Sequence, residues 1–231
     1  METTNSSKTL RKNTNLYRYD LTDNTPKNWS TDVHSVEYST GRGYKNNCGA
    51  FFFFDNITAA EKLCEKAKKE ANIQTSTITS CHTTKDLTFL NLSEYENPSQ
   101  MICNLYEKGI DIFNKGFVKF GEDPTDDASI DVLKEAFVKV LNTSKETKEG
   151  LSIITQYSQK INDFFDSFES ERKGHACRYI CQLLTDFDNG PIFKKMLLEK
   201  GFDGYCFRED PGSLTYCIFD SHALSSPERD R

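Results

Sequence analysis

The chain has 231 residues, 36% of them hydrophobic, and its 35 acidic and 29 basic side chains give a net charge of −6 at pH 7. This length suits one large domain or two small ones, and the acidic balance makes nucleic acid an unlikely main partner, because phosphate binding needs a dense basic surface. No apolar stretch approaches the roughly 20 residues of a membrane-spanning helix and the first residues contain no secretory signal, so we expect a cytoplasmic protein with no membrane partner.

The first part of the chain combines strands with one helix. Residues 1–13, rich in Asn, Thr and Ser, predict a disordered lead. Alternating β-forming residues and a compact aromatic run predict strands, while apolar periodicity after the aromatic run predicts a helix. We expect strands at 16–21, 50–55, 76–81 and 86–92, and the helix at 58–71.

The middle of the chain, 93–200, has a helical pattern. Ile130, Leu133 and Phe137 recur at the three- and four-residue spacing of an amphipathic helix. A last helix is predicted to start at Asn189, and Gly201 is placed where a left-handed C-terminal cap belongs. These residues predict a large helical insertion.

The end of the chain predicts a hairpin over 202–224, with Pro211 and Gly212 in its turn and a flexible tail at 225–231. A lone hairpin is marginally stable, so these strands should pair with those of the first part. The prediction is therefore a single α+β domain over 14–224.

Arg18 lies in the middle of the first predicted strand. An arginine there is costly to bury without a partner, so it should face a cleft, an anion or a carboxylate. The alternative is a solvent-facing side chain on a half-exposed strand.

The stretch from Ser39 to Glu65 joins a glycine-containing loop, an aromatic strand and an acidic helix. It resembles the RES family, with Gly41-Arg42-Gly43 at the family's loop, Phe54 at its Tyr and Glu65 at its Glu. It is also similar to diphtheria-toxin-like transferases and poly(ADP-ribose) polymerases. The resemblance implies an ADP-ribosyltransferase-like split sheet, with the helical insertion between its N-terminal and C-terminal strands.

The closing segment resembles the last hairpin of the same families. Where the transferases carry a catalytic Glu, this chain has Thr215, while Glu209 is expected in the turn and Ser213 just beyond it. The third member of the catalytic set is therefore either Glu209 or absent.

The resemblance implies an enzyme that uses NAD as a substrate. It would cleave the nicotinamide–ribose bond and pass ADP-ribose to a protein, to phosphate or to water. A carboxylate from Glu65 or Glu209 would stabilise the oxocarbenium-like transition state, and Arg18 would hold phosphate or ribose. Phe54 and Tyr44 would stack on nicotinamide. Further cofactor-binding residues are expected at Ser39, Thr40, Gly41, Arg42 and Ser213.

The sequence is also open to other interpretations. A catalytically inactive relative would serve as a ligand-binding or protein-interaction domain, and a toxin-like effector is a third alternative. Thr58 and Glu61 fit a capping box, which explains Glu61 without chemistry. The eight cysteines are predicted to be reduced thiols, and no metal site is expected, since only His175, Cys177 and Cys181 cluster.

Overall fold

The computed structural model divides the chain into two units, Met1–Glu94 with Thr185–Arg231, and Tyr95–Leu184. It describes residues 7–31, 48–93, 101, 104–105, 108–110, 184–185, 189–210 and 212–230. Nearly all of these belong to the first unit. Most of the expected helical insertion lies outside the described residues.

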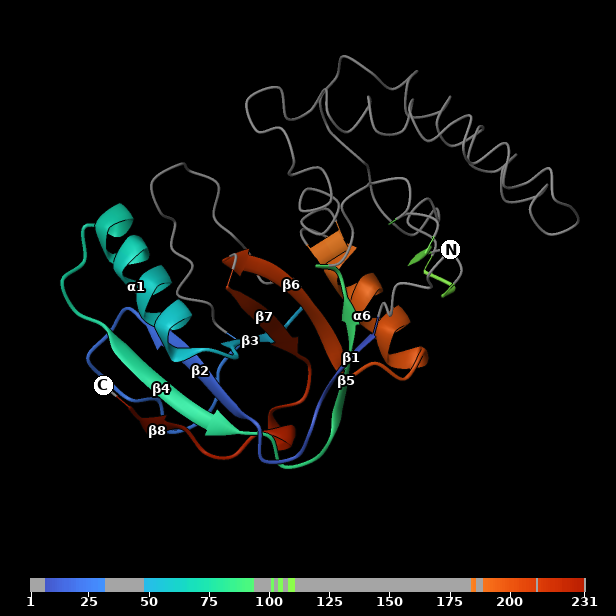
Figure 1. Cartoon of the computed structure of the whole chain (residues 1–231), viewed down its shortest axis with the longest axis horizontal. Coiled ribbons are helices and arrows are strands. Elements are labelled where there is room, and N and C mark those ends of the chain that lie inside the picture. Colours follow the sequence, from blue (N-terminus) through green and yellow to red (C-terminus); the bar gives the residue numbers. More distant parts are fainter. Residues whose placement is uncertain are drawn as a thin grey trace, which may run out of the picture. The chain divides into compact units, whose positions relative to one another are not determined.

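The described residues form a mixed α+β unit around an eight-stranded sheet with the order β1-β5-β6-β7-β3-β2-β4-β8 (Figure 1). The predicted C-terminal hairpin is confirmed as β6 and β7, and β7 pairs with β3 of the first part. The two ends of the chain thus share one sheet. The strands are β1 (Ser7–Leu10), β2 (Asn15–Asp20), β3 (Phe51–Phe54), β4 (Thr77–His82), β5 (Leu87–Asn91), β6 (Gly204–Asp210), β7 (Ser213–Ile218) and β8 (Glu228–Arg229).

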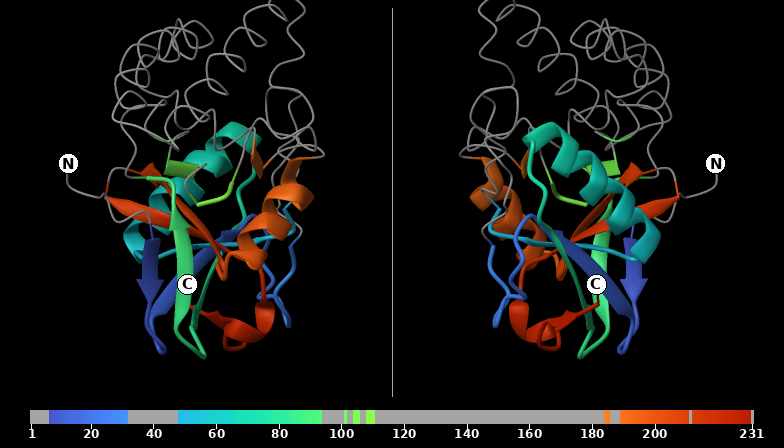
Figure 2. Two further views of the ribbon diagram at one scale, coloured as in Figure 1. Left: turned by 90° about the vertical axis from the view of Figure 1, so that its right-hand side faces the viewer. Right: turned by 90° about the vertical axis from the view of Figure 1, so that its left-hand side faces the viewer.

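Helical elements accompany these strands. They are α1 (Ile57–Ala71), α6 (Asn189–Glu199) and the short 3-10 helix η1 (Ser221–Ala223). Both predicted helices of this unit are confirmed, and Gly201 has the expected left-handed backbone with φ of 80°. The side views show how strongly the sheet twists and curves (Figure 2).

Two predictions about the chain ends are wrong. Residues 7–10 of the expected disordered lead form β1, which pairs antiparallel with β5. Part of the expected flexible tail forms β8, which pairs with β4. Both are short, polar edge strands. They are defined by hydrogen bonds to a neighbouring strand and have no apolar alternation from which they could be predicted.

The two faces of the sheet carry different clusters of side chains, because successive residues of a strand alternate between faces. Leu16, Phe53 and Tyr216 belong to the larger cluster, on what we call the inner face. Ala223 and Leu224, which follow the last long strand, also belong to it. The inner face is therefore closed partly by chain that is outside the sheet.

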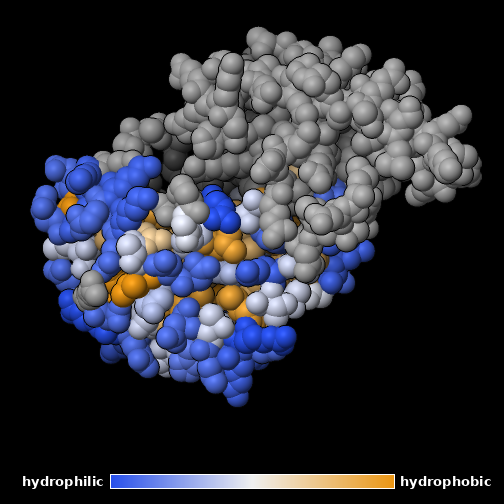
Figure 3. Space-filling view, in the orientation of Figure 1, coloured by the Kyte–Doolittle hydropathy of each residue, from blue (hydrophilic) through white to orange (hydrophobic). Residues whose placement is uncertain are grey.

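The opposite face, which we call the outer face, is covered by α1 and α6. Tyr19 of β2 packs with Cys64 and Ala67 of α1. Phe193 of α6 packs on Tyr205 of β6 with ring centroids 5.6 Å apart. The solvent side of α1 is hydrophilic (Figure 3), as expected of an amphipathic helix that buries one stripe.

The start of α1 differs from the predicted capping box. The N-cap is Asn56, whose side-chain oxygen accepts a hydrogen bond from the Thr58 amide at 2.8 Å. Thr58 is already inside the helix, so a capping duty does not explain Glu61.

We expect Asn56→Ala to lower the free energy of unfolding by about 1 kcal/mol, because it leaves a helix-end amide without its acceptor. Asn56→Asp keeps the acceptor and should be nearly neutral. Chemical denaturation of both variants checks this, and equal stabilities for the Ala and Asp variants would contradict it.

Candidate functional site

Arg18 lies in a buried ion pair on the inner face. Its Nε and Nη2 atoms donate to Oδ1 of Asp20 at 3.1 and 2.9 Å, and its Nη1 donates to the Ser30 carbonyl at 2.9 Å. The side chains of Arg18 and Asp20 are only 11% and 5% exposed. Arg18 therefore faces a carboxylate, one of the three expected surroundings, and the alternative of a solvent-facing arginine is wrong.

Phe54 ends β3 on the outer face. Its ring stacks on Tyr19 with centroids 6.0 Å apart and planes 12° apart. Register pairing places Tyr17 on one side of Phe54 and Thr215 on the other. Because Tyr17 is the partner of Phe54, Arg18 must project from the opposite face. The structure therefore does not bring the predicted guanidinium and aromatic ring together.

The hairpin residues contact the end of β3. Ser213 is buried, and its hydroxyl donates to Oδ1 of Asp55 at 2.8 Å, where the Leu214 amide also donates at 3.2 Å. Asp55 was not predicted, although it directly follows the aromatic run. Glu209 lies within β6 and not in the turn, so that expectation is wrong; its side chain lies outside what the structure describes.

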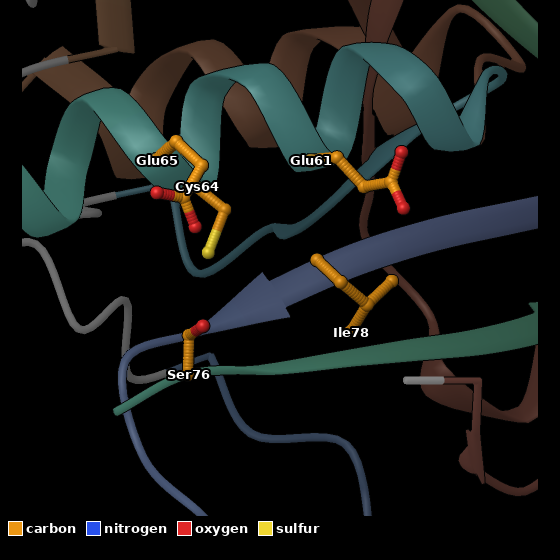
Figure 4. A pocket seen from close by; sticks show the side chains of 5 residues that line it. All are labelled: Glu61, Cys64, Glu65, Ser76 and Ile78. Carbon is orange, nitrogen blue, oxygen red and sulfur yellow. The ribbon is translucent and has the colours of Figure 1, made fainter. Parts of the chain in front are cut away.

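Glu65 lies on α1, away from Arg18. Its carboxylate pairs with Lys68 of the next helical turn at 2.9 Å and is 61% exposed. Glu65 and Glu61 border a cavity of about 310 Å³ between α1 and the start of β4 (Figure 4). Cys64, Ser76 and Ile78 complete its lining.

Two thiols, those of Cys64 and Cys81, are poorly suited to nucleophilic chemistry. Burial raises the pKa of Cys64, an effect that a hydrogen bond with Ser76 partly opposes. Burial raises the pKa of Cys81 to about 12, with a smaller contribution from Glu228. Thiolates, the reactive form, are therefore scarce at neutral pH. Among the described residues, no cluster of His, Cys, Asp and Glu could hold a metal ion.

The glycine-containing loop carries the other expected cofactor-binding residues. These residues lie outside the part of the chain that the structure describes. They are Ser39, Thr40, Gly41, Arg42 and Tyr44.

A segment that sequence reasoning missed makes contacts on the inner face through Trp29 and Ser30. Residues 21–31, which we call the strap, follow β2 and carry Trp29. The Trp29 ring meets Phe53 edge-on, with centroids 4.9 Å apart and planes 85° apart, and its Nε1 donates to the Ser225 carbonyl at 2.7 Å. The sequence offered one signal for this segment, because Trp29 is the only tryptophan of the chain.

The arrangement thus gives two separate sets of predicted residues. The outer face holds Phe54 and Thr215 side by side, while the inner face holds Arg18 beside the strap. No protein-family model matches the chain, and no curated protein or solved structure matches it either. Every helix within the described ranges is too short or too polar to cross a lipid bilayer.

Proposed function

We propose that this chain is a catalytically inactive relative of the RES and ADP-ribosyltransferase families that binds an NAD-type dinucleotide without cleaving it. The observation that carries this proposal is the separation of Arg18 and Phe54 onto opposite faces of the sheet. A single sugar cannot contact both side chains from one side of a sheet.

The fold supports the relationship in a general way. Strands from both ends of the chain form one sheet, and the C-terminal hairpin joins the aromatic strand β3. A sheet shared by both ends of the chain is compatible with the resemblance. The ADP-ribosyltransferase-type split sheet with its helical insertion remains part of the proposal.

The loss of cleavage follows from the chemistry of the residue that lies beside Phe54. Breaking the nicotinamide–ribose bond builds positive charge on the sugar, which a nearby carboxylate stabilises. Thr215, buried beside Phe54, offers an uncharged hydroxyl at that place. Without the carboxylate, the transition state loses its main electrostatic stabilisation.

Arg18 supports the retention of dinucleotide binding. A guanidinium has five donor N–H groups and suits phosphate oxygens. Asp20 engages two of its nitrogens, and Nη1 is directed to a neutral backbone carbonyl. A dinucleotide phosphate would be a stronger partner for Nη1 than that carbonyl.

An active enzyme is the second candidate. It is favoured by Glu65, which borders a cavity together with Glu61 and has no capping duty. In that case Glu65 or Glu209 would supply the carboxylate, and ADP-ribose would pass to a protein, to phosphate or to water.

One experiment separates the two candidates. The purified chain is incubated with NAD while nicotinamide release is followed by chromatography, and its melting temperature is measured with increasing NAD. We expect the melting temperature to rise, because binding to the folded state stabilises it, and nicotinamide release to stay at the level of buffer.

The proposal would be overturned if the wild type released nicotinamide and the release fell in Glu65→Gln or Glu209→Gln but not in the neighbouring control Glu61→Gln. That result would establish an enzyme. If NAD causes neither nicotinamide release nor a melting shift at any concentration, a protein-interaction domain is the remaining candidate.

A further inference from the structure

We draw no further inference here: the strongest candidate, the cavity of about 310 Å³ between α1 and the start of β4, belongs to the second candidate function already described, and apart from its two carboxylates, Glu61 and Glu65, no observation on the described residues points to a ligand.

Discussion

Arg18→Gln is expected to lower the free energy of unfolding by about 3–5 kcal/mol, the largest of the expected effects on stability. The substitution removes the guanidinium that pairs with the Asp20 carboxylate, a side chain only 5% exposed. A buried charge without a partner costs far more than the pair contributes when intact. Denaturant titration, analysed for midpoint and slope, measures the loss.

The matched control is the double variant Arg18→Gln with Asp20→Asn. It removes both charges, so most of the lost stability should return, because the cost arises from keeping a buried carboxylate after its guanidinium is removed and not from the missing contact. An Arg18→Gln variant within about 1 kcal/mol of the wild type would contradict burial of this pair.

Gly204→Ala should be the second most damaging change, with a loss of about 3 kcal/mol. Gly204 starts β6 and is paired with Ile218 of β7 and with Phe89 of β5. A Cβ at this position would overlap the backbone carbonyl oxygen of Cys217 and approach the Phe89 ring to 3.2 Å. Since backbone atoms cannot rotate away, the strands themselves must separate.

Gly201→Asn serves as its control. A Cβ at Gly201 meets no atom within 4 Å, and asparagine tolerates the left-handed backbone found there. Thermal unfolding should show a small shift for Gly201→Asn and a large one for Gly204→Ala. Similar melting temperatures for the two variants would show that loss of glycine flexibility, and not the overlap with Cys217, sets the cost.

Elements with strong local patterns could be predicted from the sequence. The alternation of residues 16–21, the aromatic run 51–54 and the helical pattern of 58–71 each point to one type of structure, and each is confirmed. β1 and β8 could not be predicted in this way. Their residues, Ser-Lys-Thr-Leu and Glu-Arg, become strands only through backbone pairing with β5 and β4.

The site was harder to predict because it depends on register. Sequence places Arg18 and Phe54 in two strands but does not give the alignment of those strands. A shift of one residue moves every side chain of a strand to the other face. The pairing of Tyr17 with Phe54 decides that Arg18 faces the strap and Phe54 faces α1. The hypothesis of a shared site therefore depended on a fact that only the folded chain contains.

The strap was missed for a different reason. Residues 21–31 are mostly polar and carry no repeating apolar pattern, so they indicate a loop. Their role comes from contacts with residues far along the chain, above all Ser225, which lies 196 positions beyond Trp29. Local propensity contains no information about such a contact.

The parallel pairing of β5 with β6 bears on how the protein is made. β5 ends at Asn91 and β6 begins at Gly204, and β7, which lies between β6 and β3, is later still. At typical elongation rates a ribosome needs on the order of ten seconds to add the intervening residues. Throughout that interval β3 and β5 each have an edge without its final neighbour, and the aromatic run of β3 is exposed to other chains. The nascent polypeptide should therefore bind chaperones until the C-terminal hairpin has left the exit tunnel.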